Sequence, residues 1–197
     1  ADAMQRGDAL YRDVVDHKPP AIYDIYRAAF AIFGPYQTHG VHLFVLLAVL
    51  ATAWALRSGA RSIRGEERDG DIAALCWVVF STAWHDYDAL AANCELFLVL
   101  PQAAAFAVLV GGKRETTEAQ KHGGFTEKKS GEARVGIPQY VLVGLLVGVS
   151  ATLKYQGFTF LGVIALALLL EVIERRISLW RALGLYVVAK TASVVPL

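Results

Sequence analysis

The chain has 197 residues, of which 55% are hydrophobic, and its formal net charge at pH 7 is +1. Its apolar residues gather into blocks of about 13 to 20, near the length that a helix needs to cross a hydrocarbon core, which excludes an ordinary soluble domain. A charge so close to neutral gives no sign of a nucleic-acid partner, and we expect none. Cys76 and Cys94 lack metal-ligand or CxxC spacing, so we expect two buried thiols. These features predict an all-α, polytopic transmembrane helix bundle.

The chain opens on a polar segment, residues 1–20, that ends in a double proline. Asp13, Asp16, His17 and Lys18 lie close together in this segment, within the stretch YRDVVDHKPP. Carboxylates beside a membrane can act as general bases or hold a cation, and a lysine can bind a phosphate as a point charge. A solvated loop that merely leads into a helix is the alternative. We predict that this segment is an outer, active-site loop.

Residues 21–34 carry apolar side chains at helical spacing directly after the double proline. Proline is tolerated in a first helical turn, and Gly34-Pro35 supplies a stop. Asp24 and Arg27 make the stretch amphipathic. We therefore predict a helix that lies at the membrane interface.

About six further stretches are apolar enough to be membrane segments. Their ranges are 41–56, 72–91, 95–110, 138–153, 157–173 and 182–197. Most lysines and arginines fall in alternate connections, above all in residues 111–136, which we predict to be a flexible cytoplasmic loop. The positive-inside rule then places the first loop, the segment before Glu95 and the turn at Lys154 on the same, non-cytoplasmic face.

A second polar cluster, Asn93 and Glu95, directly precedes the apolar run that begins at Leu96. An acid at the mouth of a membrane span is costly unless it is used or paired. Alternatively, Glu95 suits the dipole of the first helical turn and Asn93 caps it. The two interpretations are compatible.

A third cluster, Lys154, Tyr155 and Gln156, interrupts two apolar runs. The lysine could bind an anionic lipid headgroup, or it could simply extend to the interface beside an ordinary interfacial tyrosine. In the preceding run, Gly144 and Gly148 form a small-xxx-small pattern, which permits close approach of another helix.

In their order, these motifs resemble the GT-C superfamily of membrane glycosyltransferases, in the branch of protein mannosyltransferase-like and aminoarabinose transferase-like enzymes. The stretches that carry the resemblance are Gly7 to Asp13, Asp16 to Pro20, Phe33-Gly34, Ala92 to Phe97, Leu100-Pro101 and Leu153 to Gln156. Members of the family usually carry an acidic catalytic residue upstream of the first glycine. The equivalent stretch would precede Ala1, and the chain ends within an apolar run, so we expect 1–197 to be a fragment, a partial GT-C-like domain.

The resemblance implies transfer of a sugar from a polyprenyl-phosphate donor to a glycan, lipid or protein acceptor on the outer face, by displacement with inversion. Lys18 would bind the donor phosphate, Glu95 would orient the acceptor or a cation, and Lys154 would add a second phosphate contact. Part of the superfamily uses a divalent cation and part does not, so the metal requirement stays undecided. The full set of candidates is catalytic Glu95, Asp13 and Asp16, and substrate-binding His17, Lys18, Asn93, Lys154, Tyr155 and Gln156.

Two other classes of function are compatible with a polytopic chain that binds membrane lipids: a lipid or solute transporter, and a non-catalytic membrane subunit. Transporters tend to place their charges at mid-membrane on broken helices, whereas the charges here fall at the ends of the apolar runs. This favours an enzyme. The resemblance implies the bacterial inner membrane as its location, with the active face outward.

Overall fold

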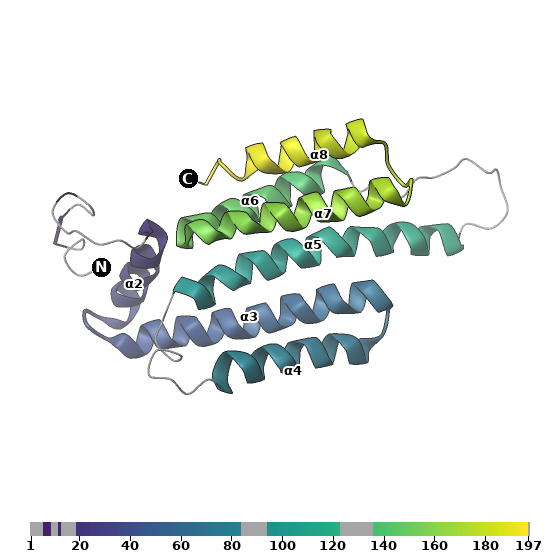
Figure 1. Ribbon diagram of the computed structural model, residues 1–197. Coiled ribbons are helices and arrows are strands. Elements are labelled where there is room, and N and C mark those ends of the chain that lie inside the picture. Colours follow the sequence, from purple (N-terminus) through teal and green to yellow (C-terminus); the bar gives the residue numbers. More distant parts are fainter. Residues whose placement is uncertain (1–5, 9–11, 13–18, 84–93, 123–135, 197) are drawn as a thin grey trace.

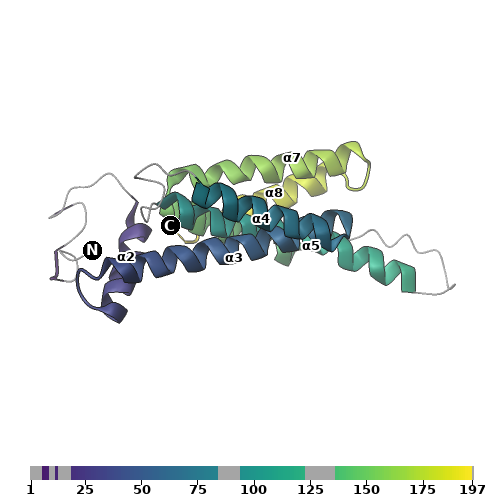
Figure 2. The same ribbon diagram turned by 90° about the horizontal axis from the view of Figure 1, so that it is seen from below.

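The computed structural model describes residues 6–8, 12, 19–83, 94–122 and 136–196 (Figure 1). Its elements are α2 (Pro20–Phe33), α3 (Thr38–Arg64), α4 (Glu67–Ala83), α5 (Cys94–His122), α6 (Ile137–Leu153), the 3-10 helix η1 (Tyr155–Thr159), α7 (Phe160–Ile173) and α8 (Leu179–Ala192). Helices α3 to α8 run side by side as a bundle, and α2 crosses one end of it (Figures 1 and 2). The prediction of an all-α chain is confirmed for the described residues.

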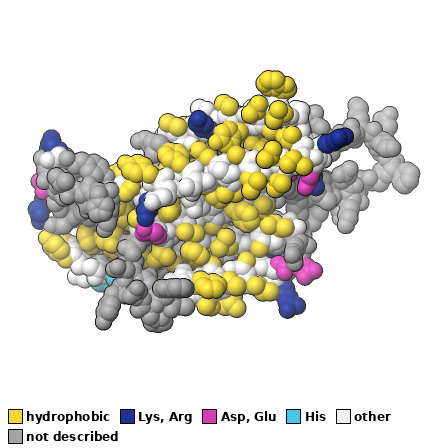
Figure 3. Space-filling model, viewed as in Figure 1, with side chains coloured by type: hydrophobic (Ala, Val, Ile, Leu, Met, Phe, Trp, Pro, Cys, Tyr) yellow, Lys and Arg dark blue, Asp and Glu magenta, His cyan; other side chains and the backbone are white. Residues whose placement is uncertain are grey.

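Three of the described helical stretches are long and apolar enough to cross a membrane: Thr38–Ile63, Cys94–Gly111 and Tyr155–Ile173. Ile137–Leu153 is apolar but shorter. The most apolar stretch of Tyr155–Ile173 is only 17% buried inside the bundle. Hydrophobic side chains cover much of the middle of the surface in Figure 3, whereas most charged ones lie near the two ends. By length, composition and surface, the described chain has the character of a membrane protein, and the number of six spans stays a prediction.

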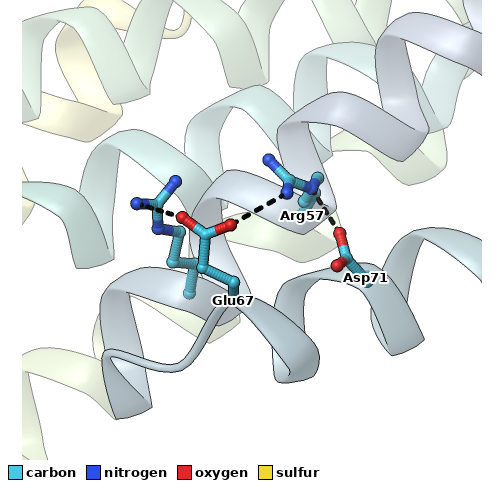
Figure 4. Close-up of polar contacts among 4 residues, drawn as sticks. Arg57, Glu67 and Asp71 are labelled. Atoms are coloured by element: carbon cyan, nitrogen blue, oxygen red, sulfur yellow. Dashed lines mark hydrogen bonds and ion pairs between the residues drawn. The ribbon is translucent and has the colours of Figure 1, made fainter.

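Helix α4 starts earlier than the predicted segment 72–91, because ion pairs hold its first turns against the end of α3 (Figure 4). Arg57 Nε lies 2.6 Å from an oxygen of Asp71, and Arg57 and Arg61 lie 3.6 and 2.7 Å from Glu67. Carboxylates in a first turn also suit the positive end of the helix dipole. The last residues of the predicted segment lie outside the described part of the chain.

The cysteine side chains are less buried than we expected. Cys76 is exposed on α4, and Cys94 is partly exposed at the start of α5. On α4, the neighbouring Trp77 faces α3 and donates a hydrogen bond to the Val49 carbonyl at 3.0 Å. Successive helix positions point about 100° apart, so the position beside Trp77 turns away from α3. The prediction of two buried thiols was wrong: this geometry exposes Cys76, and Cys94 lies in the first turn of α5, at the end of the bundle.

Helix α5 continues to His122, into the predicted flexible loop 111–136. Figures 1 and 2 show it projecting beyond its neighbours. The residues after Gly111 include lysine, arginine, glutamate, alanine and glutamine, which favour helix, and extending an existing helix needs no new nucleus. The loop prediction was therefore wrong for the residues up to His122, and residues 123–135 lie outside the described part.

The small-xxx-small pattern on α6 lies against the C-terminal end of α8. A Cβ atom at Gly144 would overlap the Ala189 carbonyl, and one at Gly148 would overlap the Ser193 carbonyl. The apolar core between α6, α7 and α8 includes Val147 and has no solvent access there. The predicted close helix approach is confirmed, and it fixes how α8 seats on α6.

Two hydrogen bonds from α6 side chains set the register of α6 against α5. Gln139 Nε2 donates to the Val108 carbonyl, and the buried Ser150 hydroxyl donates to the Leu98 carbonyl at 3.3 Å. Pro101 lies inside α5 and has no N–H to donate to the Phe97 carbonyl one turn earlier. The register places the start of α5 beside the end of α6.

Helix α2 matches the predicted stretch 21–34 closely. Its apolar face joins a buried cluster that includes Ile22, Phe97 and Leu153, which come from α2, α5 and α6. On its polar face, Arg27 and Asp24 form an exposed ion pair at 3.2 Å. The packing therefore holds α2 across the end of the bundle where α5 begins and α6 ends.

Candidate functional site

Glu95 and Lys154 form an ion pair at the end of the bundle that α2 crosses. The Lys154 ammonium donates to Glu95 Oε1 across 59 residues of sequence. Glu95 stands in the first turn of α5, and Lys154 follows the last residue of α6 with an extended backbone. The Lys154 side chain is 32% exposed and that of Glu95 is 53% exposed. The two charges therefore meet in a place that solutes can reach.

The second carboxylate oxygen of Glu95 has its own donor. The Cys94 thiol lies 3.3 Å from Glu95 Oε2, so a thiol and an ammonium engage the two oxygens of one carboxylate. Cys94 was not a predicted site residue. Its place next to Glu95 in the sequence was a usable signal, but adjacent residues on a helix do not usually face each other.

The charge of Lys154 is secure at neutral pH. The hydrogen bond and charge of Glu95 raise the pKa of Lys154 above its ordinary value, against the opposing effect of partial desolvation. The pair therefore favours the ammonium form. At neutral pH the site therefore presents a cation next to a carboxylate.

The sign of this pKa shift predicts how the pair contributes to stability. A raised lysine pKa means that the contribution is complete below the ordinary value of 10.5 and is lost as pH rises through the higher folded-state pKa. We expect wild type and Lys154→Gln to differ by about 1 kcal/mol or less, equally at pH 7 and pH 9, and to converge in stronger base. Thermal unfolding of both in detergent at several pH values measures this, and a difference that disappears between pH 6 and pH 8 would contradict it.

The structure places only part of the predicted site. Tyr155 and Gln156 follow Lys154 in η1, and both are exposed. The other candidates, Asp13, Asp16, His17, Lys18 and Asn93, lie outside the described residues. Of the predicted residues that the structure describes, Glu95 and Lys154 are thus the two that come together from separate stretches.

Within the described ranges, no group of three or more His, Cys, Asp or Glu side chains could hold a metal ion. The charged groups at this site are the Lys154 ammonium and the Glu95 carboxylate. An ammonium can bind a phosphate as a point charge, and a carboxylate can accept a proton or hold a hydroxyl group of a ligand.

No protein-family model, curated protein or solved structure matches this chain. The class of this protein therefore has to be inferred from its own sequence and structure. They form an all-helical bundle with three helices that could span a membrane and an exposed ion pair at one end.

Proposed function

We propose that the protein is a membrane glycosyltransferase that moves a sugar from a polyprenyl-phosphate donor to an acceptor on the non-cytoplasmic face, with inversion. The observation that carries this proposal is the contact between Glu95 and Lys154. Both residues were candidates on separate grounds, and the resemblance to GT-C enzymes gives both a role at one site.

Helix α2, which directly follows the predicted first loop, packs in the same region. Ile22, in the first turn of α2, belongs to the buried cluster that also holds Phe97 and Leu153. These two residues lie two positions after Glu95 and one before Lys154. Pro19 and the start of α2 therefore lie at the end of the bundle that carries the ion pair, which supports our proposal that the predicted first loop shares this site.

The charge of each candidate side chain decides the role that we propose for it. We assign Lys18 to the donor phosphate, Lys154 to a second phosphate contact, and Glu95 to orienting the acceptor or a cation. The remaining candidates around the sugar and acceptor are Asp13, Asp16, His17, Asn93, Tyr155 and Gln156.

The orientation of the site in the membrane is part of the same proposal. Arg57 and Arg61 lie in the last two turns of α3, before the α3–α4 connection, and Arg175 and Arg176 lie in the α7–α8 connection. Both connections are at the end of the bundle opposite α2 (Figures 1 and 2). The positive-inside rule makes this end cytoplasmic, and the Glu95 and Lys154 end then faces outward from a bacterial inner membrane.

The test is an assay of sugar transfer by the full-length protein from a labelled polyprenyl-phosphate donor. We expect Lys18→Ala and Glu95→Gln each to lower the transfer rate by about 100-fold or more, as the loss of one charge-stabilising group does in other enzymes. Arg27→Gln, which removes an exposed charge from the polar face of α2, is the matched control and should keep full activity. Full activity in both test variants would contradict the proposal. Solute uptake into proteoliposomes without transfer would favour a transporter instead.

A further inference from the structure

The turn between α7 and α8 has an arginine where helices usually end in glycine. Arg175 has a positive φ of 57°. The Arg175 N–H donates to the Val172 carbonyl at 3.0 Å, and the Arg176 N–H donates to the Glu171 carbonyl at 2.9 Å. This pair of bonds is the Schellman motif, whose left-handed position favours glycine because a side chain strains it. A long charged side chain at such a position suggests a use for the charge.

The guanidinium group of Arg175 is available to a ligand. Its neighbour Arg176 is neutralised by Glu174 at 2.7 Å. Among the described residues, no acidic group forms an ion pair with Arg175, which is exposed. Among the described residues of the turn, Arg175 is therefore a cation without an acidic partner, and the two backbone hydrogen bonds hold its position in the chain.

Exposed apolar side chains lie close to Arg175 in the sequence, at the facing ends of α7 and α8. Trp180, five residues further on, is 83% exposed, and Ile173 and Leu179 are also exposed. The candidate span Tyr155–Ile173 ends two residues before Arg175. Tryptophan at the end of an apolar span is typical of the zone where lipid headgroups meet hydrocarbon. A cation at the end of an apolar span, five residues before an exposed tryptophan, suits a lipid phosphate above acyl chains.

We propose that the α7–α8 turn binds the headgroup of an anionic phospholipid, with Arg175 on the phosphate and Trp180, Ile173 and Leu179 against the acyl chains. Charge complementarity and the end of the span beside the turn select this occupant. A protein partner would find little flat surface on a turn of five residues between two helices. The proposal is independent of sugar transfer, because the α7–α8 turn lies at the opposite end of the bundle from the start of α5 and the end of α6, which carry the Glu95–Lys154 pair (Figures 1 and 2).

The experiment titrates the full chain in detergent with phosphatidylglycerol or phosphatidylcholine and reads lipid binding by native mass spectrometry. Arg175→Asn removes the charge, and asparagine tolerates a positive φ. We expect it to weaken phosphatidylglycerol binding about fivefold and to leave phosphatidylcholine binding unchanged. Arg175→Lys keeps the charge and should keep the affinity.

The matched control is Lys190→Gln, which removes one exposed charge from the last turn of α8, near the other end of that helix. It should bind phosphatidylglycerol like wild type. Unchanged affinity in Arg175→Asn overturns the proposal, and so does an equal loss in both variants. Competition by millimolar inorganic phosphate would assign the turn to free phosphate and also overturns it. Unfolding temperatures check that each variant folds, and Arg175→Gly, with the residue usual at this position, replaces Arg175→Asn if it does not.

Discussion

Replacing Lys154 with methionine should lower sugar transfer by about 100-fold or more while leaving the unfolding temperature almost unchanged. The contrast follows from where the pair lies. Lys154 and Glu95 are both partly exposed, and exposed ion pairs contribute only about 0–1 kcal/mol to stability. If Lys154 holds a phosphate, as we propose, its charge has a larger effect on the reaction, because no water molecule replaces a fixed ammonium at the phosphate. Transfer rates and thermal unfolding of the same preparations measure both quantities.

The double variant Glu95→Gln/Lys154→Met separates chemistry from structure. If the pair only joined α5 to α6, removing both charges would leave no unpaired group, and the double variant would recover activity that each single variant loses. If both side chains contact substrates, as we propose, the double variant stays as inactive as the worse single variant. Recovery in the double variant would therefore count against a direct role. Cys94→Ala is a useful companion, because it removes the thiol donor to Glu95 and leaves both charges in place.

Local signals were enough to predict much of the fold. Prolines and glycines mark the ends of α2, and the break at Lys154 separates α6 from η1. The spacing of Gly144 and Gly148 predicted a close helix contact, because only glycine leaves room for another backbone. Each of these features depends on residues near one another in the sequence.

The features that the sequence did not show depend on contacts between distant residues. The start of α4 is held by a pair between Arg57 and Asp71, which no helical periodicity reveals. Alternation of spans placed Glu95 and Lys154 on the same face, but their contact also requires the register that the Ser150 hydrogen bond to Leu98 helps to set. The distribution of lysines and arginines predicts on which side of the membrane a residue lies, whereas the distance between Glu95 and Lys154 depends on how α5 and α6 pack.

Two glycines on facing helices should respond to alanine in opposite directions. A Cβ at Gly144 would overlap the backbone carbonyl of Ala189 on α8, so α6 and α8 must separate to admit it. Such overpacking usually costs about 1–3 kcal/mol. Gly184, on α8, has open space at its Cβ position. There alanine lowers the conformational freedom of the unfolded chain and should stabilise the helix by about 0.5–1 kcal/mol.

Thermal unfolding of Gly144→Ala and Gly184→Ala in one detergent measures both effects, and each variant is the other's control for the added methyl group. We expect the midpoint to fall for Gly144→Ala and to rise slightly for Gly184→Ala. Equal shifts would mean that α6 and α8 do not pack as closely as the overlap at Gly144 requires. Because Ser150 is on α6 with Gly144, separating α6 from α8 should also strain the α5–α6 register, so Gly144→Ala should lower activity more than its loss of stability explains.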